Sequence, residues 1–67
     1  MNSQPFDDVD VYFEFTVVGG AVRVAAIDGV SGVEVTVMGP AGAARADLER
    51  LALAKLRARL ARGLIKP

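Results

Sequence analysis

The sequence predicts a small α+β domain, in which a three-stranded antiparallel meander (β-β-β) carries one C-terminal amphipathic helix packed on one face. Apolar residues alternate with period two in three short segments before residue 40, and after it they take the spacing of a helix. The 67 residues allow one domain with a thin core, because a chain this short buries only about 60% of the surface that its unfolded form exposes. We expect a flexible acidic tail over 1–9, a single β-β-β-α domain over 10–64 and a C-terminal tail over 65–67.

The first two strands are predicted to form a hairpin over 11–18 and 21–28. Every odd-numbered residue of the first segment is apolar. Gly19-Gly20 permits the positive φ angles of a two-residue primed turn. Such a turn sets Phe15 opposite Val24, and this register gathers the apolar residues of both strands on one face.

The third strand is predicted over 33–38, after a turn that begins at Asp28 and a four-residue loop over 29–32. This loop length sets Val35 opposite Ala26, so that the second strand becomes the middle one. Gly39-Pro40-Ala41-Gly42 is predicted to end the sheet, because proline has no N–H to donate to a neighbouring strand and glycine weakens both strands and helices.

An amphipathic helix is predicted from about residue 43 to Arg62, because five apolar residues fall within about 140° of arc. They are Leu48, Ala52, Leu53, Leu56 and Leu60. Leu56 is expected near the centre of this stripe, above Phe13 and Phe15. Gly63 is the expected stop, with Leu64 folding back on the last turn. Gly42 and Asp47 both remain candidates for the N-cap.

The sequence argues against chemistry of its own. It contains neither His nor Cys, the commonest general base and the commonest thiol nucleophile. We therefore expect no enzyme activity, no catalytic residue, no cofactor and no small-molecule substrate. Asp7, Asp8 and Asp10 are interpreted as a solvated acidic tail rather than a cation site, which needs 6–8 oxygens for calcium. No metal is expected.

Length and charge suggest the cellular location of the protein and the kind of partner that it binds. No apolar run approaches the ~18 residues that span a bilayer, and the first residues are acidic where a signal peptide is basic. We expect a cytoplasmic protein without a membrane partner. Residues 1–40 carry six acidic side chains against one arginine, whereas residues 41–67 carry seven basic against two acidic ones. Such a charge separation orients molecules during association.

The open face of the predicted sheet is the first candidate interface, with other copies of the chain or other proteins as partners. Its residues are Tyr12, Thr16, Val18, Arg23, Ile27, Thr36 and Met38. The segment 11–18 is in addition an edge strand with a single charge, Glu14, and no proline, so it lacks the usual protection against pairing. We predict a small non-catalytic protein-interaction module that forms a homodimer by pairing this strand with its copy.

Nucleic-acid binding is the alternative function, through the basic helix. The order β-β-β-α resembles most of a double-stranded-RNA-binding domain, which needs Lys or Arg at the N-terminal end of its last helix. Here acidic residues dilute that end, and the candidate contacts are Arg50, Arg57, Arg59 and Arg62. We interpret these arginines first as a solvated face that matches the helix dipole.

Four segments of the chain together resemble a family of short alphaproteobacterial proteins of unknown function. They are Val11 to Phe15 (Val-Tyr-Phe-Glu-Phe), Val22 to Asp28, which ends in Ala-Ile-Asp, Gly39-Pro40, and Leu48 to Leu56 (Leu-Glu-Arg-Leu-Ala-Leu-x-Lys-Leu). The resemblance covers most of residues 10–62. It implies a bacterial protein with a shared fold, and it implies no activity, because core and turn positions carry it.

Overall fold

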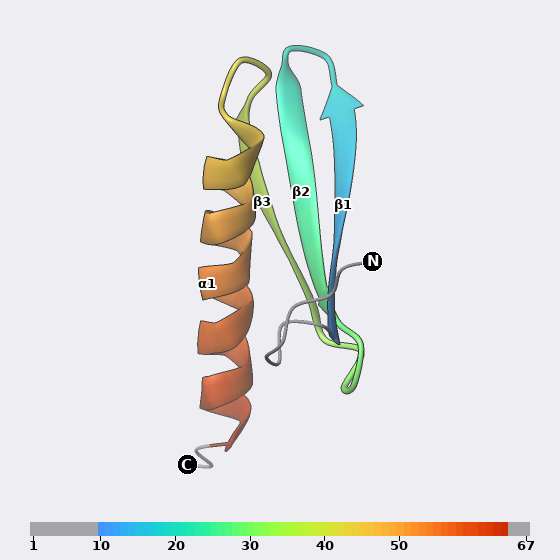
Figure 1. Cartoon of the computed structure of the whole chain (residues 1–67), viewed down its shortest axis with the longest axis vertical. Coiled ribbons are helices and arrows are strands. Elements are labelled where there is room, and N and C mark those ends of the chain that lie inside the picture. Colours follow the sequence, from blue (N-terminus) through green and yellow to red (C-terminus); the bar gives the residue numbers. More distant parts are fainter. Residues whose placement is uncertain (1–9, 65–67) are drawn as a thin grey trace.

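The computed structural model describes residues 10–64, with only the backbone of Leu64. Its elements are β1 (Val11–Val18), β2 (Ala21–Asp28), β3 (Glu34–Pro40) and α1 (Arg45–Leu64). The strands form one antiparallel sheet in the order β1-β2-β3, and α1 packs against it (Figure 1). The predicted α+β meander is therefore confirmed. The tails expected over 1–9 and 65–67 lie outside the described residues.

The β1–β2 hairpin has the predicted register. Val18 lies opposite Ala21 across the turn and Phe15 lies opposite Val24. Gly19 has a φ of 62°, and Gly20 is not among the described glycines with a positive φ. A positive φ at the first central residue alone is the pattern of a type II′ turn, whose twist matches that of the two strands.

The β2–β3 connection is held by the side chain of Asp28. Its Oδ2 accepts hydrogen bonds from the Ser31 hydroxyl at 2.7 Å and from the Ser31 N–H at 2.8 Å. The hydroxyl contributes most to a lowered pKa of Asp28, followed by the Ser31 N–H. Gly32 closes the turn with a φ of 81°, and Val35 lies opposite Ala26 as predicted.

β3 differs from the prediction at both ends, since it begins at Glu34 and continues through Pro40. The Asp28 N–H donates to the Val33 carbonyl, and the Ala41 N–H donates to the Gly20 carbonyl. These two bonds show that the odd-numbered residues of β3 bond to β2, whereas the even-numbered ones point outward. The backbone of Pro40 therefore points away from β2. A proline at this position removes no hydrogen bond of the sheet. The sheet therefore ends within the predicted segment 39–42, but at Pro40 and not at Met38.

The ends of α1 also differ from the prediction. The helix begins at Arg45, after Ala44, whose carbonyl accepts the N–H groups of Asp47 and Leu48. Neither Gly42 nor Asp47 is thus the N-cap; Asp47 lies in the first turn, where its charge suits the helix dipole. Gly63 is helical and has no positive φ, so the expected stop there is wrong. The contact expected from the Leu64 side chain lies outside the described residues.

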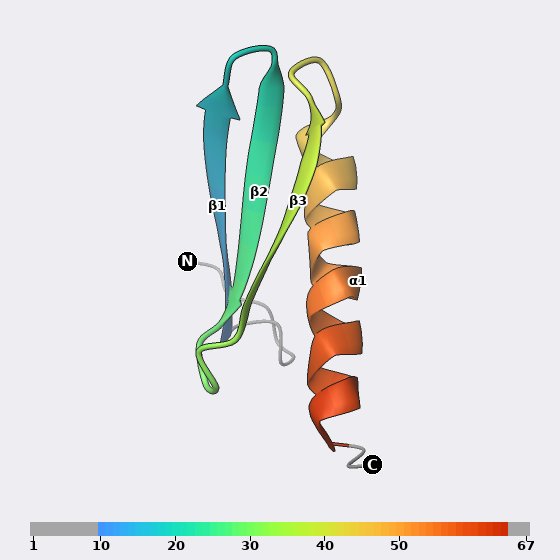
Figure 2. The ribbon, with the colours of Figure 1, turned by 180° about the vertical axis from the view of Figure 1, so that it is seen from behind.

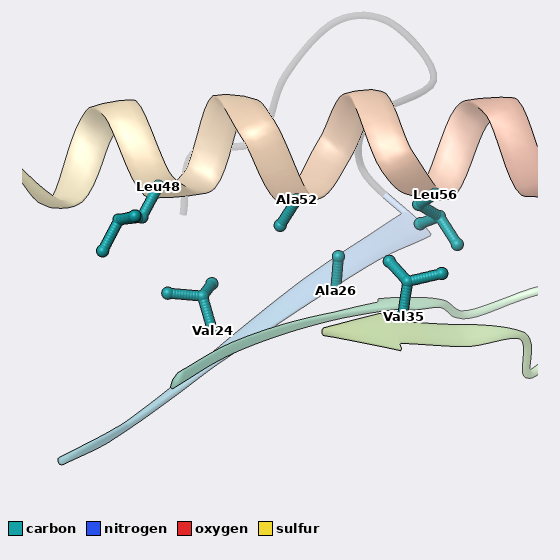
Figure 3. Packing of buried hydrophobic residues seen from close by; sticks show 6 residues of the cluster. All are labelled: Val24, Ala26, Val35, Leu48, Ala52 and Leu56. Carbon is teal, nitrogen blue, oxygen red and sulfur yellow. The ribbon is translucent and has the colours of Figure 1, made fainter. Parts of the chain in front are cut away.

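The core lies between α1 and the two strands beneath it. Three residues of the sheet (Val24, Ala26, Val35) meet three of the helix (Leu48, Ala52, Leu56) in Figure 3. Leu56 is completely buried, as predicted. A Cβ atom on Gly39 would lie 2.6 Å from Leu48 Cδ2, so the glycine allows this end of the helix to approach the sheet closely.

The helix is not centred on the sheet. It packs on β2 and β3 and has little contact with β1, which is the strand farthest from it in Figures 1 and 2. A helix about 10 Å wide covers two strands spaced about 4.8 Å apart. Phe13 and Phe15 lie on the inner face as predicted but are only half-buried. Both rings also pack against the core, so the expected cover by the helix stripe is present only in part.

Candidate interaction surfaces

The residues predicted as an interface all lie on the outer face of the sheet, away from α1. The register aligns them across the strands in rows: Tyr12 with Ile27, Thr16 with Arg23 and Met38, Thr36 beside Ala25, and Val18 at the β1–β2 turn. Tyr12, Val18 and Met38 are 59%, 53% and 57% exposed, whereas Ile27 is half-buried. The placement is confirmed, and their role in an interface remains a prediction.

Charges divide this outer face. Glu14 lies beside Ala25 on the neighbouring strand, and Glu34 lies beside Ile27. Arg23 separates Thr16 from Met38. Among the described residues, only the row at the β1–β2 turn crosses all three strands without a polar side chain, through Val18, Ala21 and Pro40. Exposed apolar side chains scattered in this way are usual for protein surfaces.

The inner face of β1 is a second apolar surface, although the alternation of its residues predicts core. We call its three residues, Phe13, Phe15 and Val17, the β1 shelf. Val17 is 71% exposed. Arg45 at the start of α1 lies over the Phe15 ring, with its Cζ 4.4 Å from the ring centroid, and covers part of it. Alternation in a sequence shows which face a residue is on, but not whether anything covers that face.

The edge of β1 that faces away from β2 is free of backbone partners among the described residues. The hydrogen bond from Gly29 N–H to the Asp10 carbonyl shows which residues of β1 bond to β2, because bonding and non-bonding residues alternate along a strand. The even-numbered residues of β1 therefore bond to β2, and the N–H and C=O groups of the odd-numbered ones point outward. These are the groups of Val11 and of the β1 shelf.

The edge of β3, in contrast, is partly occupied. The Thr36 backbone points away from β2, because Thr36 alternates with residues that bond to β2. Its carbonyl accepts a hydrogen bond of 2.7 Å from the Lys55 ammonium group. Lys55 thus reaches from α1 around the edge of the sheet. The Pro40 nitrogen, also directed outward, carries no N–H to donate.

The position of Lys55 shows which side of α1 faces the β1 shelf. At 3.6 residues per turn, Leu53 and Leu60 lie about 160° and about 140° around the helix axis from Lys55. Both leucines are half-buried, and Leu60 packs against the core. They therefore form the side of the helix that faces away from the β3 edge and toward β1.

The four arginines of the alternative function do not share one face of α1. Arg50 and Arg57 lie within about 20° of each other around the axis, whereas Arg59 and Arg62 lie about 140–160° from Arg57. Arg50 forms a salt bridge with Asp47. A phosphate backbone along the helix would not contact all four at once, and nucleic-acid binding through them remains a prediction.

The acidic residues considered as a cation site are not brought together in the described part of the chain. Asp7 and Asp8 lie outside the described residues, and Asp10 is exposed at the start of β1. Within residues 10–64, no three Asp, Glu, His or Cys side chains are close enough to hold a metal ion. In the same range, no helix is long and apolar enough to span a membrane.

Comparison with known proteins identifies a family but no individual relative. No curated protein and no solved structure matches the chain. A family model described as "Domain of unknown function (DUF6898)" matches residues 8–63, a range that contains β1, β2, β3 and nearly all of α1. The matched range agrees with the resemblance to an uncharacterised family, while an alphaproteobacterial source remains an expectation. Since this model spans most of the sequence, including all three strands and nearly all of the helix, the chain belongs to the DUF6898 family.

Proposed function

We propose that this chain is a non-catalytic protein-interaction module that associates with a second copy of itself through the free edge of β1. The observation that carries the proposal is the difference between the two edges of the sheet. Lys55 occupies the Thr36 carbonyl on the β3 edge, whereas no described residue covers the outward groups of β1. An open, regular edge strand is a template for pairing with another strand.

The composition of β1 supports pairing. Its eight residues contain one charge, Glu14, and no proline. The Glu14 side chain lies on the outer face, so it does not block the edge itself. Natural edge strands are commonly protected by lysine, proline, a bulge or an inward-pointing charge. None of these devices is present in β1.

The β1 shelf supplies an apolar contribution to the same contact. A strand added beside β1 would place its own side chains next to Phe13, Phe15 and Val17. Backbone hydrogen bonds then supply affinity, and the neighbouring side chains supply specificity. A sheet extended in this way also buries apolar area that α1 leaves uncovered, at about 25 cal/mol for each Å².

The test is the oligomeric state of the full chain, with two matched lysine variants. Val17 and Val30 are 71% and 79% exposed, and Val30 lies in the β2–β3 turn, away from the edge. At about 100 µM, well above the Kd of a micromolar complex, we expect the natural chain and Val30→Lys to sediment as dimers. Val17→Lys should sediment as a monomer, because its charge lies on the shelf at the contact. A monomeric natural chain would refute the proposal, as would a Val17→Lys variant that dimerises normally.

A further inference from the structure

We propose that two copies pair their β1 strands with Phe15 opposite its own copy, on the two-fold axis of the dimer. This inference rests on the proposed association through β1 and specifies its register. It sets Phe13 opposite the partner's Val17 on the inner face. On the outer face it sets Tyr12 opposite the partner's Val18, and Glu14 opposite the partner's Thr16.

The alternation of the backbone restricts the registers. Only the odd-numbered residues of β1 present N–H and C=O groups to the free edge. In an antiparallel pair, residues that exchange hydrogen bonds lie directly opposite each other. An odd-numbered residue must therefore face an odd-numbered one. Of the symmetric registers that satisfy this rule, only those centred on Glu14 or on Phe15 pair seven of the eight residues of β1.

The charge of Glu14 decides between these two registers. A register centred on Glu14 places two carboxylates directly opposite each other on one face, in a pair whose Cα atoms lie only about 4.5 Å apart. Like charges in this position are destabilising. The register centred on Phe15 moves each Glu14 opposite a threonine, whose hydroxyl can donate a hydrogen bond to the carboxylate.

The exposed apolar residues favour the same register. Tyr12 and Val18 are each more than half exposed on the outer face, and the register centred on Phe15 places them opposite each other. It also places Val17, the most exposed residue of the β1 shelf, opposite a phenylalanine. The register centred on Glu14 would leave Val18 opposite the partner's Asp10.

The same register brings the two Arg45 side chains toward the axis, since each lies over its own Phe15 ring. Both are exposed, so their charges interact largely through water and are screened by salt. We expect the dimer to become tighter as the salt concentration rises, in contrast to an association driven by opposite charges.

Disulfide crosslinking distinguishes the two registers, and the natural chain has no cysteine that would interfere. Pairs that do not exchange hydrogen bonds have Cα atoms about 4.5 Å apart, within the range of a disulfide. Diagonal pairs are about 7–8 Å apart and lie beyond it. In one mixture Tyr12→Cys is combined with Val18→Cys, the pair that the register centred on Phe15 brings together. In a second mixture it is combined with Thr16→Cys, the pair that the register centred on Glu14 brings together. Both mixtures retain Glu14. A mixture of Tyr12→Cys with Thr36→Cys, an exposed outer-face position on β3, measures crosslinking by random collision.

Under mild oxidation we expect the Tyr12→Cys and Val18→Cys chains to crosslink several-fold faster than either other mixture. Preferential crosslinking of Tyr12→Cys with Thr16→Cys would overturn the register centred on Phe15 in favour of the one centred on Glu14. If the natural chain sediments as a dimer in that case, the proposed function stands and only the register fails. Crosslinking of Tyr12→Cys with Val18→Cys at the rate of the Thr36→Cys mixture also overturns it. A monomeric natural chain overturns both proposals.

Discussion

Replacing Leu56 by alanine tests the arrangement of the core most directly. Leu56 is completely buried between α1 and the sheet, beside Ala52 and Val35. Truncating such a leucine costs about 2–5 kcal/mol, which includes the cavity that it leaves. A core in a domain of this size supplies no more than roughly 3–5 kcal/mol in total. Leu56→Ala should therefore leave much of the chain unfolded at about 25 °C.

Leu51→Ala is the matched control, because it makes the same substitution on the same helix at a position that is 59% exposed. It should change the free energy of unfolding by about 0.5 kcal/mol or less. Phe15→Ala should fall between the two, at about 2 kcal/mol, since the half-buried ring gives up only part of the 3–5 kcal/mol lost with a buried phenylalanine. The order Leu56, Phe15, Leu51 follows from the off-centre position of α1.

The assay is urea unfolding followed by circular dichroism, at a protein concentration low enough to keep the chain monomeric, because dimerisation would add to the apparent stability. A cooperative transition of Leu56→Ala within about 1 kcal/mol of the natural chain would refute the core described above. If Phe15→Ala were as damaging as Leu56→Ala in the monomer, β1 would have to be covered, and the β1 shelf would not exist.

Two further positions give predictions that depend on single contacts. Gly39→Ala should lower the free energy of unfolding by about 1 kcal/mol or more, because its Cβ would meet Leu48 Cδ2 at 2.6 Å. Denaturant unfolding should show this cost, whereas Gly20→Ala, with nothing within 4 Å of its Cβ, should lack it. The pKa of Asp28 is lowered in the folded state, first by the Ser31 hydroxyl, so its charge stabilises the fold above a pH of about 3.8 and this contribution is lost as the pH falls through the lowered value. The urea midpoints of the natural chain and Asp28→Asn should therefore converge between about pH 6 and about pH 2, and a constant difference between them would contradict this role of the carboxylate.

The register of the sheet could be predicted from the sequence, because two local signals agreed on it. Period-two alternation assigned the faces, and Gly19-Gly20 set the length of the hairpin turn. The strand β3 continues past its predicted last residue, Met38, to Pro40, because the cost of proline depends on whether its nitrogen points toward a neighbouring strand. That direction is set by the pairing with β2 and by no local signal.

The uncovered surfaces could be predicted only in part. Val17 has the sequence pattern of a core residue yet is 71% exposed, because one helix is too narrow for three strands. The width of a helix relative to the spacing of strands indicates that one outer strand stays open. Which strand it is depends on the path of α1, and the contact of Lys55 with Thr36, 19 residues apart, has no local signal. The outer-face residues were placed correctly because they need only the alternation.

The hydrogen bond from Lys55 to Thr36 also limits how large an assembly can become. A two-fold contact uses the same edge of both chains, so a pair formed through β1 presents only its two β3 edges to further molecules. At each of these edges the Lys55 ammonium group already occupies the Thr36 carbonyl, which an added strand would need as a hydrogen-bond acceptor. Strand addition would then stop at a dimer with one continuous six-stranded sheet and would not continue into a cross-β filament. Removal of the amine, as in Lys55→Ala, would free that carbonyl for an added strand, while Pro40 would still offer no N–H farther along the edge.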